Sequence, residues 1–206
     1  PTEGQIWYNT TSNTLKGSTV TTSGTWAAGG NLNTARNTLN GEKIGIQTAA
    51  LIAGGYNGAY LSITESYNGA SWSPVSSMNN NRVYAGAVGT QTAGLAFGGF
   101  STANSNATEE YDGSAWTAGG NLATARLDLG GCGTQTAGLA FGGYTTAATN
   151  ATEEYNGTSW TAGGNLGTAR FSPAGAGTQT SALGFGGYTT TQLANTEEYD
   201  GTSWLN

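Results

Sequence analysis

Residues 117–160 read TAGGNLATARLDLGGCGTQTAGLAFGGYTTAATNATEEYNGTSW, and residues 161–204 follow at once with TAGGNLGTARFSPAGAGTQTSALGFGGYTTTQLANTEEYDGTSW. Aligned without a gap, 29 of their 44 positions are identical, so the two segments are copies of one structural unit. Tryptophans continue the 44-residue spacing towards the N-terminus, at Trp72, Trp116, Trp160 and Trp204. A fixed period of this size is typical of repeat architectures.

The repeats divide the chain into two parts. Four full copies occupy residues 27–72, 73–116, 117–160 and 161–204, and we assign residues 27–206 to them. Residues 1–26 contain an Ile-Trp-Tyr run and end on Trp26, but lack the other landmarks of the unit. We expect this segment to form an N-terminal β-hairpin or a partial copy.

Each copy has the pattern of four short β-strands. Runs of small residues or β-formers alternate with turn signals about every ten residues, as in VYAGAVGT, AGLAFGGF, ATEEYDG and SAW of the second copy. Asn-Gly or Asp-Gly stands between the Tyr run and the Trp of each copy, where a tight hairpin needs positive φ. No segment shows a sustained helical period, so the sequence predicts an all-β fold.

Four landmarks recur in fixed order: an Arg before the first strand, Gly-Gly ending the second, a Tyr in the third and a Trp in the fourth. This order resembles the kelch repeat of β-propellers, although kelch units usually have about 50 residues. The resemblance implies four-stranded blades that pack face to face around an axis. The recurring Trp72, Trp116, Trp160 and Trp204 are then expected to be mostly buried at blade junctions.

The number of blades stays open at this point. Four copies give four blades, and the N-terminal segment could add an atypical fifth. The segment could instead be a hairpin beside four blades, or the ring could be open and completed by another chain, which leaves a homo-oligomer possible.

Composition excludes several kinds of partner. The net charge of the 206-residue chain is −6, its pI is near 4.4, and it has only six Lys and Arg, which disfavours nucleic acid and anionic membranes as partners. Polar residues and glycines interrupt the long uncharged stretch between Arg82 and Glu109, so we expect no membrane insertion. Because the chain begins at Pro1 and shows no signal peptide, we expect a fragment or a processed product.

The residues offer little for catalysis. The chain has no His and one Cys, so the commonest general base and the usual metal clusters are missing, and we expect no metal, no cofactor and no enzymatic activity. Glu-Glu pairs could serve a glycosidase, but a catalytic pair is normally assembled once and not repeated. One Arg and one Glu instead recur at equivalent positions in all four copies, which predicts structural ion pairs among Arg36, Arg82, Arg126, Arg170, Glu65, Glu109, Glu153 and Glu197.

The loop between the second and third strands differs most among the copies, whereas TAGGNL and GTQT recur almost unchanged in the later copies, as expected of framework turns. Variable loops on a rigid scaffold are the usual place for binding. The candidate loops are residues 56–64, 100–108, 144–152 and 188–196. An aromatic residue opens each loop and could stack on sugar rings: Tyr56, Phe100, Tyr144 and Tyr188. The alternative, which the sequence favours, is that these rings cap the core of each blade.

The copies and the leading PTEGQIWYNTTSNTLKG both resemble segments of tailed-phage tail or fibre proteins. The resemblance implies a non-catalytic virion module that attaches to a host-surface glycan or to a neighbouring virion protein. The alternative is a secreted, lectin-like propeller that binds glycans. Either function places the protein in a virion or outside the cell.

Overall fold

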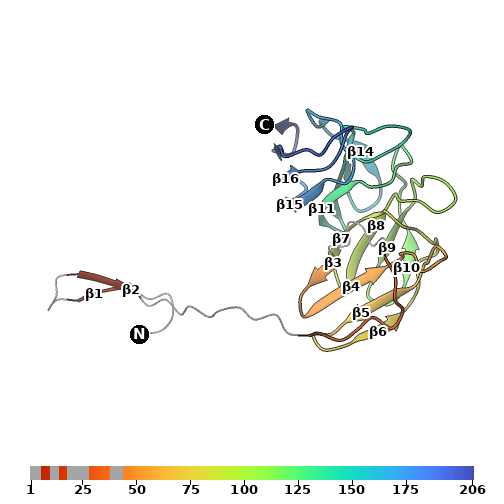
Figure 1. Ribbon diagram of the computed structural model, residues 1–206, viewed down its shortest axis with the longest axis horizontal. Coiled ribbons are helices and arrows are strands. Elements are labelled where there is room, and N and C mark those ends of the chain that lie inside the picture. The colour runs from red at the N-terminus through yellow and green to blue at the C-terminus, as the bar shows by residue number, and fades with distance from the viewer. Residues whose placement is uncertain (1–5, 10–13, 18–27, 38–43) are drawn as a thin grey trace.

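The computed structural model describes residues 6–9, 14–17, 28–37 and 44–206. These residues form four four-stranded antiparallel sheets and one two-stranded hairpin, and no helix occurs among them (Figure 1). The hairpin pairs β1 (Ile6–Asn9) with β2 (Thr14–Gly17). Trp26 lies outside the described residues.

Each copy of the repeat forms one sheet, and its strands pair in sequence order. The first sheet contains β3 (Ile44–Ile46), β4 (Ala49–Ala53), β5 (Thr64–Tyr67) and β6 (Trp72–Val75). The second contains β7 (Gly86–Thr90), β8 (Ala93–Phe97), β9 (Thr108–Tyr111) and β10 (Trp116–Ala118). The third contains β11 (Gly130–Thr134), β12 (Ala137–Phe141), β13 (Thr152–Tyr155) and β14 (Trp160–Ala162). The fourth contains β15 (Ala174–Thr178), β16 (Ser181–Phe185), β17 (Thr196–Tyr199) and β18 (Trp204–Leu205).

The sheets follow one another along an arc, with the first and the fourth at its two ends (Figure 1). The first strands of the sheets pack in series, β3 on β7, β7 on β11 and β11 on β15, so they form the inner side of the arc. This arrangement of four-stranded antiparallel blades is that of a β-propeller.

Glycine accounts for two recurring details of the blade. The Asx-Gly turns take the predicted positive φ, for example 93° at Gly113. The Gly-Gly pairs let neighbouring loops approach closely, since a Cβ at Gly98 would lie 2.8 Å from the carbonyl oxygen of Arg126. A larger residue at either place would strain the backbone.

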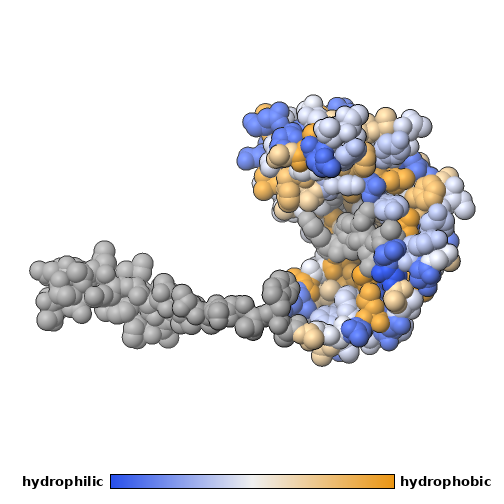
Figure 2. Space-filling model, in the orientation of Figure 1, coloured by the Kyte–Doolittle hydropathy of each residue, from blue (hydrophilic) through white to orange (hydrophobic). Residues whose placement is uncertain are grey.

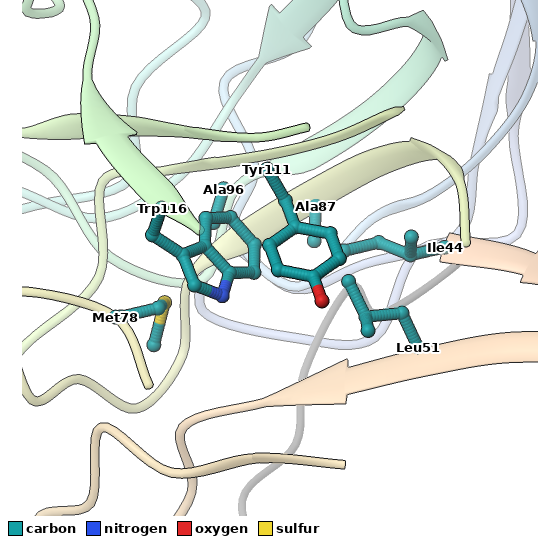
Figure 3. Packing of buried hydrophobic residues seen from close by; sticks show 7 residues of the cluster. All are labelled: Ile44, Leu51, Met78, Ala87, Ala96, Tyr111 and Trp116. Atoms are coloured by element: carbon teal, nitrogen blue, oxygen red, sulfur yellow. The ribbon is translucent and has the colours of Figure 1, made fainter. Parts of the chain in front are cut away.

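Apolar residues fill the space between consecutive blades. At the first junction, Trp116 and Tyr111 of the second sheet lie near Ile44 and Leu51 of the first, and Met78 is part of the same cluster (Figure 3). Similar clusters join the second blade to the third and the third to the fourth.

The tryptophans meet the expectation of burial only in part. Trp116 and Trp204 are buried, and Trp160 is half-buried against the second cluster. Trp72 is also half-buried, but it belongs to the first blade, which no described four-stranded sheet precedes. The described residues therefore form no blade junction at Trp72, because a junction needs a blade on each side.

Candidate functional site

The predicted Arg–Glu pairs are ion pairs in all four blades, and their side chains are buried. The guanidinium nitrogen and the carboxylate oxygen are 3.1 Å apart in Arg36–Glu65, 2.6 Å in Arg82–Glu109 and 3.1 Å in Arg126–Glu153. Arg170 and Glu197 form the fourth pair. Burying a charge is costly unless it is paired, and each pair removes this cost within one copy of the repeat.

The ion pairs hold the loops on which the candidate site stands. Arg82 donates from Nη1 to the carbonyls of Gly98 and Ala107, at 3.2 and 2.9 Å, and these residues flank the second blade's variable loop. Asn79 donates from its backbone and its side chain to Glu109, at 2.6 and 2.9 Å. The carboxylate is thus engaged on all sides, which is a structural arrangement.

Four of the ion-paired groups have shifted pKa values: burial lowers the pKa of Arg36 and Arg126 as well as that of Arg82, and the pKa of Glu65 is also lowered. The effect of burial on the pKa of Arg82 is opposed by the charge of Glu109. Burial acts to raise the pKa of Glu65, but hydrogen bonds from Asn33 and Thr34 and the charge of Arg36 outweigh it and lower the pKa. The lowered pKa of Glu65 favours its charged form, which the ion pair with Arg36 requires.

In the second and third blades, the second Glu of the pair has another role, at the junction with the next blade. The hydroxyl of Tyr155 donates to Glu110 of the preceding blade, and that of Tyr199 donates to Glu154. Burial, with the hydrogen bond to Glu110, raises the pKa of Tyr155 to about 12. Glu110 and Glu154 thus join consecutive blades, whereas Glu198 of the fourth blade is exposed.

An aromatic pocket lies between the first and second blades, on the side of the variable loops. It has a volume of about 190 Å³ and is lined by Tyr56, Tyr60, Val83, Tyr84 and Phe100. The Tyr60 ring bridges two of the predicted aromatics, with its centroid 5.5 Å from that of Tyr56 and 5.8 Å from that of Phe100. Apolar walls with hydroxyl groups suit a ligand that has both apolar and hydrogen-bonding surfaces.

The other two predicted aromatics form a second cluster, between the third and fourth blades. Phe171 bridges Tyr144 and Tyr188, with centroid distances of 5.4 and 5.2 Å. Among the described residues no ring contact links Phe100 with Tyr144. The structure thus brings the four predicted residues together as two pairs and not as one platform.

Three of the four predicted aromatics are exposed, and the fourth is half-buried. Tyr56 is 38% exposed, Tyr144 and Tyr188 are 36% exposed, and Phe100 is half-buried. Each ring therefore packs on its neighbours and also meets solvent. Capping the blade and contacting a ligand are compatible for such rings.

One backbone position of the pocket has an unusual conformation. Tyr84 has φ of 56°, and the equivalent residues Asp128 and Ser172 have 54° and 52°. Their backbones form a chain, in which Asp128 N–H donates to Tyr84 O at 2.9 Å and Ser172 N–H donates to Asp128 O at 2.7 Å. Non-glycine residues rarely adopt positive φ, and such positions concentrate at functional sites.

Sequence reasoning missed Tyr60, Tyr84 and Phe171. Each stands where the copies differ: Tyr60 aligns with Asn104, and Tyr84 aligns with Asp128. Comparing the side chains at equivalent positions of the copies, and noting where they change, could have identified these residues.

The charge of the loops is also distinctive. The four candidate loops contain no Asp, Glu, Lys or Arg. Among the described residues, no group of three or more His, Cys, Asp or Glu could hold a metal ion, and no helix has the length and apolarity to cross a membrane. The site therefore offers neutral polar and aromatic contacts.

No protein-family model and no curated protein matches this chain. Solved structures do match, among them one titled "Structure of YjhT", with a TM-score of 0.58 and 12% sequence identity. The alignment covers 67% of this chain and 49% of that one, so the matched part spans about half of the YjhT structure. At this identity the likeness concerns the fold alone, and it agrees with the blades described above: the chain is a β-propeller of four-stranded blades.

Proposed function

We propose that this protein is a non-catalytic binding and structural module whose variable loops hold a neutral glycan. The observation that carries the proposal is the pocket of Tyr56, Tyr60, Tyr84 and Phe100, set among loops without charged residues. Aromatic faces pack on the apolar faces of sugar rings, and tyrosine hydroxyls can bond the sugar hydroxyls. A neutral ligand also suits a chain of net charge −6.

We further infer that the blades are of the kelch type and that the module is part of a phage virion, in a tail or fibre. The Arg, Gly-Gly, Tyr and Trp landmarks support the first inference, and the resemblance of the leading segment and of the Gly/Thr/Asn-rich copies supports the second. A host-surface glycan is then the expected ligand, and a neighbouring virion protein is the alternative. A secreted, lectin-like propeller would use the same pocket.

The repeat supplies substitutions that test the pocket without disturbing the fold. Tyr60→Asn and Tyr84→Ser place in the first pocket the residues that later copies carry at the same backbone positions. We expect the purified wild type to bind neutral oligosaccharides on a glycan array, and each variant to bind about tenfold more weakly, a loss of about 1.4 kcal/mol.

A matched control is Phe171→Leu, which makes the corresponding change in the second cluster, since the third copy has Leu127 there. If the first pocket is the site, this variant binds as the wild type does. If all variants bind as the wild type does, the first pocket is not the binding site. If the folded wild type binds no glycan, the ligand is not a neutral glycan.

A further inference from the structure

The three junctions between blades use one set of hydrogen bonds. The indole Nε1 of each later blade donates to a threonine Oγ1 of the preceding blade: Trp116 to Thr64 at 3.0 Å, Trp160 to Thr108 at 2.9 Å and Trp204 to Thr152 at 2.9 Å. These threonines are buried, each about 1% exposed. The partners lie 52 residues apart in every case, so the junction is itself a repeated unit.

At each junction, a glutamine of the later blade also donates hydrogen bonds to the earlier blade. Gln135 of the third blade donates from Nε2 to the carbonyls of Gly94 and Tyr111 of the second, at 3.1 and 2.8 Å. Gln179 of the fourth blade makes the same pair of bonds to the third. In this set of Trp and Gln bonds, the donor always belongs to the later blade and the acceptor to the earlier one.

This direction gives each blade two different faces. We call the face that carries the Trp, Tyr and Gln donors the donor face. We call the opposite face the acceptor face; it carries the Thr, two carbonyls and a Leu, and in the second to fourth blades also the second Glu and a Phe, whereas the first blade has Ser66 and Ala53 at those two positions. Phe97 meets Trp160, and Phe141 meets Trp204, with ring centroids 5.0 and 4.9 Å apart.

The acceptor face of the fourth blade is uncovered. Leu183 and Phe185 are 40% and 38% exposed, whereas Leu139 and Phe141 at the same positions of the third blade are 0% exposed. Thr196, which corresponds to the buried threonines, is exposed as well. A hollow of about 290 Å³ lies here, bounded by Leu183, Glu198 and other residues of this face. Exposed apolar surface of this kind marks an interaction site.

At the other end of the arc, no described blade packs on the donor face of the first blade. Tyr67 and Trp72 stack with their centroids 5.0 Å apart, as Tyr199 and Trp204 do within a formed junction. Gln47, which corresponds to Gln91, Gln135 and Gln179, is exposed. None of the described residues accepts a hydrogen bond from the Tyr67 hydroxyl, the Trp72 indole or the Gln47 amide. The first blade thus presents a preformed set of donors.

We propose that the acceptor face of the fourth blade binds the donor face of the first blade of a second copy of this chain. The partner's blade supplies what the uncovered face lacks: an indole N–H for Thr196, a tyrosine hydroxyl for Glu198, and an amide for the carbonyls of Ala182 and Tyr199. The three internal junctions provide the template for this contact. The two faces stand at opposite ends of the arc (Figure 1), and the hydropathy of the exposed surface is shown in Figure 2.

The contact is head-to-tail, because the two faces differ. Such contacts close into a ring when the rotation between copies allows it, and otherwise they extend as a filament. Self-association of this type grows with protein concentration and stops when either face is blocked.

Two variants test the contact on the full chain. Phe185→Arg places a charge on the acceptor face, and Gln47→Glu turns the amide donor into a carboxylate that would face two carbonyls. Both residues are partly or fully exposed in one copy, so each variant folds as the wild type does, which circular dichroism and thermal melting verify. Leu205→Arg is the control, because Leu205 is 59% exposed and the equivalent Thr117 and Thr161 stay exposed at formed junctions.

Sedimentation velocity over a concentration series gives the result. We expect the wild type and Leu205→Arg to associate, and Phe185→Arg and Gln47→Glu to be monomeric when alone. Mixed in equal amounts, these two variants have one intact face each, and should form a complex of one copy of each that grows no further. A wild type that stays monomeric at its highest soluble concentration would overturn the proposal. So would a Gln47→Glu variant that dimerises by itself, since two acceptor faces would then be in contact.

Discussion

The third and fourth blades have nearly the same sequence but different surroundings. They share 29 of 44 residues, and their internal geometry is alike: the hairpin glycines Gly157 and Gly201 have φ of 89° and 93°, and both blades hold a buried Arg–Glu pair. Yet Phe141 is 0% exposed, whereas Phe185 is 38% exposed. Local sequence therefore determines the blade, but the neighbouring blade determines what is buried.

The same distinction separates two kinds of stabilising contact. The ion pair of Arg126 and Glu153 joins two parts of one copy and forms wherever that copy folds. The hydrogen bond from Tyr199 to Glu154 needs two consecutive copies and has no counterpart at the end of the arc. Substitutions at equivalent positions of the third and fourth blades can separate the two contributions.

The largest difference is expected for the phenylalanines. Phe141→Ala leaves a cavity against Trp204 and should lower the free energy of unfolding by about 3–5 kcal/mol. Phe185→Ala removes a ring that one copy leaves partly in solvent, and should cost less than about 1 kcal/mol. Urea denaturation in dilute solution, where copies are separate, measures both values. If the two variants lose the same free energy of unfolding, the acceptor face of the fourth blade is covered within the single chain.

A smaller effect is expected for the tyrosine at the second junction. Tyr155→Phe removes the hydroxyl that bonds Glu110, and should cost about 1.5–3 kcal/mol at pH 8, as for hydrogen bonds to charged groups. Tyr67→Phe in the first blade is the control, because no described residue bonds that hydroxyl. Its unfolding free energy should stay within about 0.5 kcal/mol of the wild type.

The pH dependence of Tyr155→Phe gives a second measure of the same contact. The pKa of Tyr155 is raised from 10.0 to about 12 in the folded chain, so the unfolded chain loses this proton first. The contribution of the Tyr155 hydroxyl to the free energy of unfolding is therefore full below pH 10 and declines as the pH rises from 10 to 12. The difference in unfolding free energy between wild type and variant should therefore shrink from pH 9 to pH 11. A constant difference would contradict the raised pKa.

Much of the fold could be predicted because the landmarks of the repeat act within one copy. Asn156-Gly157 sets a hairpin by its own backbone preference, and the Arg and the Glu that recur once in each copy point to pairing. The aromatic site could be predicted only in part. Tyr56 and Phe100 open equivalent loops and were found by alignment, but Tyr60 and Tyr84 occur in one copy only. An alignment of the copies identifies residues that recur, so it does not identify residues that occur in one copy only.

The junction bonds could not be predicted for a different reason. Gln135 stands in the GTQT turn, and its recurrence indicates only that the turn is constant. Its partners are backbone carbonyls 41 and 24 residues away. A carbonyl has no sequence signature, since every residue has one. Only the packing of two blades shows which carbonyl lies opposite the amide.

The smallest effect is expected for this glutamine. Gln135→Ala removes two hydrogen bonds and leaves the carbonyls of Gly94 and Tyr111 without the amide, so the free energy of unfolding should fall by about 1 kcal/mol. Gln47→Ala changes the equivalent residue of the first blade, whose amide meets no preceding blade, and should have an effect within about 0.5 kcal/mol. Urea denaturation of both variants in dilute solution compares a formed junction with an unformed one. If both lose the same amount, Gln47 already has a partner within the chain, and the donor face of the first blade is not free.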